Sequence, residues 1–261
     1  MIGFIFILGA VLGSFLNVCI YRLPLGKSIV FPPSHCPACH ARLTFIDLIP
    51  VFSYLLLLGR CRHCHKPISA RYPLVEIMAG LGFVFSWLLA GGNVFDFMFF
   101  AAFISVSIVI FFTDLEHQLI PDGASYFGIG LGLIYNFIRG LQTHDWSPAN
   151  PFFSSVGGVI VGFGLLFAIS VFGKFIYKKE VMGEGDWFVA ALLGAFFGWG
   201  GALMAIFIAY LLAAMAATIL LIFKRAKFGG YVPFGPALVL GGVIVLFFGG
   251  PLLSWYWGFF L

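Results

Sequence analysis

Long apolar segments, separated by short polar breaks, constrain this chain more than any other feature of its sequence. About eight can be placed, with approximate bounds 2–20, 73–91, 94–113, 123–139, 153–176, 187–199, 201–223 and 236–258. A helix needs roughly 20 apolar residues to cross about 30 Å of hydrocarbon, and most of the segments approach that length. Charged residues make up only 9% of the chain, whereas they make up roughly 25% of a soluble domain. The sequence therefore predicts an all-α polytopic membrane protein with about eight transmembrane helices.

The distribution of basic residues predicts how these helices are oriented. Thirteen of the fourteen Lys and Arg residues lie in the first loop or beside the breaks after the fifth and seventh segments, and only Arg139 lies on the other side. Because cytoplasmic loops carry the excess of Lys and Arg, we expect the N-terminus outside and the first loop in the cytoplasm. The first segment lacks a basic start and a small-residue cleavage site, so we expect a retained helix. The pI near 8.8 follows from this topology and does not indicate a nucleic-acid partner.

Residues 24–72 form the one sizeable polar segment, between a first transmembrane helix at 1–23 and a seven-helix membrane domain at 73–261. This segment contains two Cys-x-x-Cys pairs, which are Cys36 with Cys39 and Cys61 with Cys64. Two such pairs at this spacing are typical of four thiolates that bind one structural Zn²⁺. The rival interpretation is a pair of disulfides, which a cytoplasmic loop disfavours because thiols stay reduced there. We expect a zinc-binding loop whose order depends on the metal.

Two acidic residues stand at the ends of apolar segments. Asp186 lies in Met182-Gly-Glu-Gly-Asp-Trp-Phe, and Asp114 begins a polar stretch that also contains Glu116 and Asp122. The charge distribution places Asp114 and Asp186 at the same, cytoplasmic face. Two carboxyls that meet and share one proton can hydrolyse a peptide, because the ionised one activates water while the protonated one donates to the carbonyl. From the residues alone, interfacial acids neutralised by nearby bases and the acids of a proton-coupled transporter remain open alternatives.

Small and polar residues inside the apolar segments predict contacts between helices. Gly9 and Gly13 allow another helix to approach the first one closely. Asn17 requires a hydrogen-bond partner in an apolar helix, and we expect Glu76 to pair with a nearby arginine.

With these motifs in hand, the chain resembles a known family, the type IV prepilin peptidases, which are bacterial GxGD membrane aspartyl proteases also called prepilin leader peptidase/N-methyltransferases. The resemblance covers nearly the whole chain in order. It is carried by Gly13-Ser-Phe-Leu-Asn-Val, the four cysteines, Ile68-Ser-Ala-Arg-Tyr-Pro-Leu-Val-Glu76, Asp114-Leu-Glu with Ile120-Pro-Asp122, Gly183-Glu-Gly-Asp186, and Pro233-Phe-Gly-Pro236.

The resemblance implies that Asp114 and Asp186 are the catalytic pair of a multi-pass enzyme in the bacterial cytoplasmic (inner) membrane. It implies cleavage of the short basic leader of type IV prepilins and pseudopilins on the cytoplasmic side. It also implies methylation of the new N-terminus from S-adenosylmethionine, for which the sequence contains no Gly-rich Rossmann fingerprint. One position departs from the family pattern, Gly-Asp-Val-Lys-Leu, because Phe188 stands where the Lys is usual.

Overall fold

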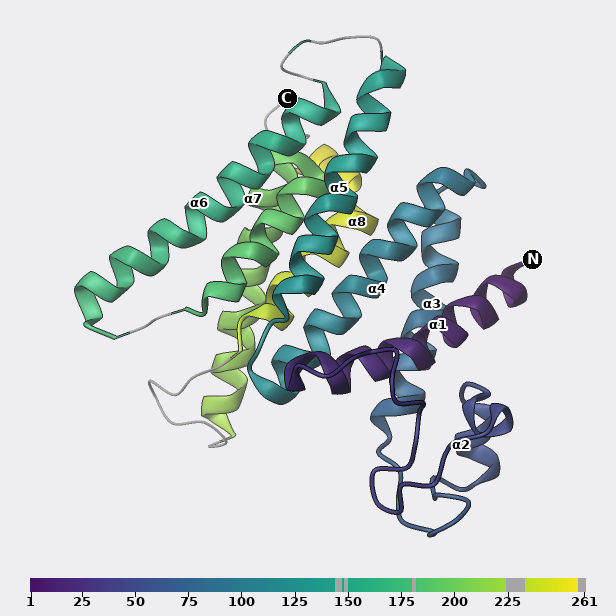
Figure 1. Cartoon of the computed structure of the whole chain (residues 1–261). Helices are drawn as coiled ribbons and strands as arrows, with labels where there is room; N and C mark the ends of the chain where they lie inside the picture. The colour runs from purple at the N-terminus through teal and green to yellow at the C-terminus, as the bar shows by residue number, and fades with distance from the viewer. Residues whose placement is uncertain (144–146, 148–149, 180–181, 224–232, 258–261) are drawn as a thin grey trace. The chain divides into compact units, whose positions relative to one another are not determined.

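The computed structural model describes residues 1–143, 147, 150–179, 182–223 and 233–257. Three of the basic residues predicted to be cytoplasmic (Lys224, Arg225 and Lys227) and residues 229–232 of the last loop lie outside this range, so their placement stays a prediction. The described part of the chain is helical, with two isolated bridges in place of a sheet (Figure 1). The eight α-helices are α1 (Ile2–Arg22), α2 (Phe52–Leu56), α3 (Arg71–Leu89), α4 (Val94–His117), α5 (Asp122–Thr143), α6 (Pro151–Tyr177), α7 (Glu184–Ile222) and α8 (Gly235–Trp257).

Six of these helices are long and apolar enough to span a membrane, namely α1, α3, α4, α6, α7 and α8. Helix α5 has 22 residues, about 33 Å at 1.5 Å per residue, but it is more polar and is not among the six. The all-α membrane architecture is therefore confirmed. The two predicted segments at 187–199 and 201–223 correspond to two parts of α7, which are separated by a break at Gly198.

The chain divides into two compact units, Met1–Val109 and Ile110–Leu261. In the first unit, α1 and α3 pack closely through glycines, as the sequence predicted. A Cβ on Gly13 would lie 2.8 Å from the Cα of Glu76, and one on Gly9 would lie 2.6 Å from the Ala79 carbonyl oxygen. The side chain of Asn17 reaches across the same contact, since its Nδ2 donates to the Tyr72 carbonyl at 3.1 Å.

The predicted pairing of Glu76 with an arginine is wrong. The buried Glu76 carboxylate accepts a hydrogen bond from the backbone N–H of Val51 at 2.8 Å, and the Ser14 side chain lies near it. The carboxylate thereby ties the loop before α2 to the α1–α3 pair. The ion pair that the structure shows in this part of the described chain is Arg62 with Asp47, at 2.8 Å.

In the second unit, α7 is broken at Gly198, whose φ of 69° and ψ of −178° are not helical. A continuous helix would place Tyr210 about 36 Å from Asp186, yet the charge of Asp186 acts on the Tyr210 phenol. The chain therefore turns back at Gly198, and α7 is a hairpin of two arms, 184–197 and 199–222. The turn frees the carbonyls of Ala195 and Phe196, and both accept hydrogen bonds from Asn136 Nδ2, at 2.8 and 3.1 Å.

Helices α5, α6 and α8 lie beside α7 (Figure 1), and small residues form the contacts between them. Gly158 of α6 contacts Gly194, and Gly162 contacts Ala190. Gly132 of α5 contacts Ala195, and Gly241 of α8 contacts Ala205. This close packing leaves no room for a Cβ at those glycines, and it fixes the two arms of the hairpin against α5, α6 and α8.

Candidate active site and metal centre

Asp114 lies in the last turn of α4 and is 3% exposed. Its Oδ2 accepts a hydrogen bond from the backbone N–H of Gly235, the first residue of α8, at 3.0 Å. A Cβ at position 235 would lie 2.6 Å from the same oxygen. Glycine is therefore required for the backbone N–H to approach the carboxylate this closely.

Asp186 lies in the first turn of α7 and is also 3% exposed. Gly185, which precedes it, packs against Ile120, where a Cβ would lie 2.8 Å from the Ile120 Cβ. The second glycine of Gly183-Glu-Gly-Asp therefore permits a close approach to the loop between α4 and α5. Gly183, with a φ of −70°, adopts a backbone conformation that is open to any residue.

The structure brings the two predicted acids to one cavity in the second unit. This cavity has a volume of about 200 Å³ and is lined by Asp114, Gln118, Leu119, Ile120, Gly183, Glu184, Gly185 and Asp186. The two carboxyls are close enough for the charge of Asp114 to act on Asp186. Since a water occupies about 30 Å³ of liquid, the cavity has room for several waters beside the carboxyl pair.

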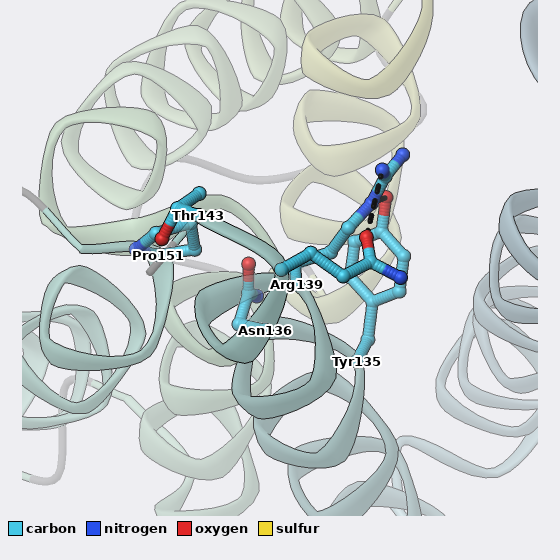
Figure 2. A pocket seen from close by; sticks show the side chains of 6 residues that line it. Tyr135, Asn136, Arg139, Thr143 and Pro151 are labelled. Carbon is cyan, nitrogen blue, oxygen red and sulfur yellow. Dashed lines mark hydrogen bonds between the residues drawn. The ribbon is translucent and has the colours of Figure 1, made fainter. Parts of the chain in front are cut away.

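A larger cavity, of about 410 Å³, lies near the opposite end of α5. Tyr135, Asn136, Arg139, Thr143 and Pro151 surround it, and the Arg139 side chain lies beside the Tyr135 ring (Figure 2). Along α5 it is roughly 20–30 Å from Asp122, which begins the helix. None of its lining residues is acidic. We therefore place the candidate active site in the smaller cavity, despite the difference in size.

Phe188, at the position where the family usually has Lys, is part of an aromatic cluster. Its ring contacts Tyr126 of α5 at 5.1 Å and Phe163 of α6 at 5.4 Å, and the neighbouring Trp187 contacts Phe167 at 5.0 Å. These edge-on and tilted contacts are of the kind that stabilises aromatic pairs. In this chain, Phe188 therefore packs the start of α7 against the apolar side chains of α5 and α6, at the position where the family pattern has a lysine.

The sequence does not reveal two residues that lie close to the site. It marks Gly235 only as part of the Pro233-Phe-Gly-Pro236 motif, and it does not mark Tyr210 at all. The Tyr210 ring packs on Phe234 with centroids 4.9 Å apart, next to the Gly235 N–H that binds Asp114. No local pattern marks Tyr210, because it is one polar atom in an apolar run. Only the turn at Gly198 brings it near the acids.

The four loop cysteines come together in the first unit. Their Sγ atoms all lie within 4.8 Å of one another, and Cys36 and Cys64 are 3.9 Å apart. A tetrahedral site with Zn–S bonds of 2.3 Å has sulfurs about 3.8 Å apart, so the cluster fits such an ion. The separation also exceeds the roughly 2.05 Å of a disulfide bond, and all four thiols are free.

Both cysteine pairs are built on the same backbone turn. In each, the residue after the second cysteine donates to the carbonyl of the first, His40 to Cys36 at 2.9 Å and His65 to Cys61 at 3.0 Å. Both histidines have a φ of 57°. The N–H groups of Cys64 and His63 donate to Cys61 Sγ and lower the pKa of this thiol to about 6. At Cys61 these hydrogen bonds favour the thiolate, which is the form that binds metal.

Comparison with known proteins gives a consistent result. The model of the bacterial Peptidase A24 N-terminal domain matches residues 7–90, and the model of the type IV leader peptidase family matches residues 101–218. No solved structure matches significantly.

Curated relatives match most of the chain. A prepilin leader peptidase/N-methyltransferase of Myxococcus xanthus is 35% identical over 84% of this chain and 63% of its own length. One of Pseudomonas putida is 34% identical over 95% of this chain and 91% of its own length. A type 4 prepilin-like proteins leader peptide-processing enzyme of Escherichia coli is 33% identical over 92% of this chain and 91% of its own length. The chain therefore belongs to the type IV prepilin leader peptidase family, Peptidase A24, and is a multi-pass membrane protein of that bacterial family.

Proposed function

We propose that this chain is a membrane aspartic endopeptidase that removes the short basic leader from type IV prepilins and related pseudopilins. The observation that carries the proposal is the pair of buried carboxyls, Asp114 and Asp186, which line one cavity and interact electrostatically. The names of the relatives supply the substrate class, since one of them processes type 4 prepilin-like proteins.

The chemistry follows from the shared cavity. One carboxylate takes a proton from a water molecule, and the water oxygen attacks the scissile carbonyl carbon. The other carboxyl donates its proton to the carbonyl oxygen, and a tetrahedral intermediate forms. As this intermediate collapses, the C–N bond breaks and the leaving amine takes a proton from the first carboxyl. Asp114 and Asp186 alternate in these roles, because two adjacent carboxyls that share one proton are never both ionised.

The position of the acids fits a substrate with a polar leader and an apolar segment. Asp114 lies three residues before the end of α4, and Asp186 lies two residues after the start of α7. Both therefore belong to the boundary of the membrane. With most of the basic residues on the same side, the positive-inside bias places this boundary at the cytoplasm and the N-terminus outside.

The four-cysteine loop completes the proposal. Residues 24–72 hold a structural Zn²⁺ through Cys36, Cys39, Cys61 and Cys64, and the bound ion supplies much of the order of the loop. The names of the relatives also include a second activity, that of an N-methyltransferase. We propose that the chain retains it with S-adenosylmethionine as the donor, without assigning residues to that donor.

A purified full-length protein, mixed with a prepilin in detergent, tests this function. Mass spectrometry of the products should show loss of the leader, with a further gain of one methyl group when S-adenosylmethionine is added. Asp114→Asn and Asp186→Asn should each abolish cleavage in a protein that is still folded and inserted. Full cleavage by either variant would refute the pair. The alternative hypothesis would then be proton-coupled transport, which also uses acidic residues of this kind.

A further inference from the structure

A tyrosine outside the carboxyl pair lies close to the elements that carry both acids. Tyr210 lies on the second arm of α7, and its ring packs on Phe234 at 4.9 Å and an interplanar angle of 42°. Phe234 immediately precedes Gly235, whose N–H donates to Asp114 Oδ2 at 3.0 Å. One ring contact therefore separates Tyr210 from the backbone group that binds Asp114.

Tyr210 also lies within the electrostatic range of the other acid. The charge of Asp186 acts on the phenol, although the two residues are 24 positions apart in the sequence. In the described part of the chain, no hydrogen bond is formed by the Tyr210 hydroxyl. A phenol beside a carboxylate with its donor unused can give that donor to the carboxylate or to an atom bound between them.

The backbone that carries Tyr210 is held firmly. Ala205 and Ala209 on the same arm are fully buried, and Gly241 of α8 approaches both of them closely enough to exclude a Cβ. The phenol is thus carried on a packed pair of helices, so its position relative to the start of α8 is defined by that packing.

We propose that Tyr210 is a positioning residue for the carboxyl pair. Its ring, through Phe234, keeps the Gly235 N–H on Asp114, and its hydroxyl orients Asp186 and the water between the two acids. This role rests on the proposed function, because it has meaning only if the two acids cleave a peptide.

The simpler interpretation is that Tyr210 is an ordinary aromatic residue of the membrane boundary. It is 37% exposed, and tyrosines are enriched where membrane meets water. That interpretation predicts that loss of the hydroxyl changes nothing in the reaction. The two interpretations therefore differ in the behaviour of a single variant.

The experiment compares Tyr210→Phe, which removes only the hydroxyl, with Tyr210→Leu, which also removes the ring. Cleavage of a prepilin by the purified full-length enzyme is measured for kcat, KM and the dependence of kcat on pH. Tyr177→Phe is the matched control, because Tyr177 lies at the end of α6 and is 70% exposed. Melting temperature and bound zinc report whether each variant is folded.

We expect Tyr210→Phe to lower kcat by about 10- to 100-fold at unchanged KM. This is the range for one hydrogen bond to a charged group, which the proposal assigns to the hydroxyl during the reaction. Its pH profile should be displaced, which a purely structural role would not cause. Tyr210→Leu should lose more, with Tyr177→Phe like the wild type. A Tyr210→Phe enzyme with wild-type kcat and pH profile would overturn the role of the hydroxyl, and a Tyr210→Leu enzyme no worse than Tyr210→Phe would overturn that of the ring. If the Asp114→Asn or Asp186→Asn enzyme still cleaves the prepilin, the proposed function itself fails. Failure of the proposed function is thereby distinguished from failure of the role proposed for Tyr210.

Discussion

Replacement of Gly235 by alanine tests the geometry of the site with a single methyl group. The φ of Gly235 is not in the left-handed region, so alanine is not strained there, and the effect comes from contact alone. The new Cβ would lie 2.6 Å from Asp114 Oδ2, whereas ordinary contact begins at 3.4 Å. The carboxylate must therefore retreat by about 0.8 Å, which stretches the 3.0 Å hydrogen bond to roughly 3.8 Å, outside the bonding range.

The expected fall in kcat follows from the free energy of the hydrogen bond between the Gly235 N–H and Asp114. A hydrogen bond to a charged group contributes about 1.5–3 kcal/mol, which corresponds to a fall in kcat of about 10- to 100-fold. The assay is prepilin cleavage by the purified enzyme under saturating substrate, with melting temperature as a measure of folding. Gly164→Ala is the matched control, because a Cβ at Gly164 of α6 meets nothing within 4 Å. A folded Gly235→Ala enzyme with wild-type kcat would show that the N–H on Asp114 has no part in the reaction.

Three further perturbations address the rest of the fold. Gly198→Ala should lower stability by about 1–2 kcal/mol or more, seen as a lower melting temperature, since alanine is strained at a φ of 69° and its Cβ would meet the Ser154 side chain. Cys36→Ser combined with Cys61→Ser should release the zinc, measured by elemental analysis, and should make the loop sensitive to protease; unchanged zinc per protein would contradict the four-thiolate site. Burial raises the pKa of Asp47, but hydrogen bonds from Thr44 and Arg62 outweigh it and lower the pKa below 3.8. Asp47 therefore stabilises the loop above that pH, by about 1 kcal/mol relative to Asp47→Asn, and the difference in hydrogen exchange between the two proteins should disappear as the pH falls through the lowered pKa.

The features that the sequence predicted well are those that a local pattern or a count determines. Long apolar runs predicted the helices, and the two Cys-x-x-Cys pairs predicted the sulfur cluster. Acids at the ends of two apolar runs pointed to Asp114 and Asp186, which line one cavity, while their catalytic role stays a prediction. Gly9 and Gly13 predicted the close packing of α1 on α3, because a missing Cβ acts in the same way wherever a helix lies against them.

The features that the sequence did not predict depend on backbone groups and on the path of the chain. Glu76 was expected to pair with an arginine, but its carboxylate accepts a hydrogen bond from the backbone N–H of Val51, and every residue except proline offers such an N–H. The sequence predicted two membrane segments that meet near residue 200, with basic residues on the same side before and after them, and a turn at Gly198 agrees with this. What it did not predict is which residues of the returning arm lie near the acids. Without that turn, Tyr210 and Gly235 could not be connected to the acids.

The turn at Gly198 also determines on which side of the membrane the next helix, α8, begins and ends. Because the hairpin returns to the side from which it started, α8 begins beside the acids and must run away from them. A straight α7 would have delivered the start of α8 to the opposite face, where Gly235 could not have reached Asp114. A reporter fused behind α8 should therefore appear on the far side of the bilayer from the two aspartates, together with the Arg139 end of α5.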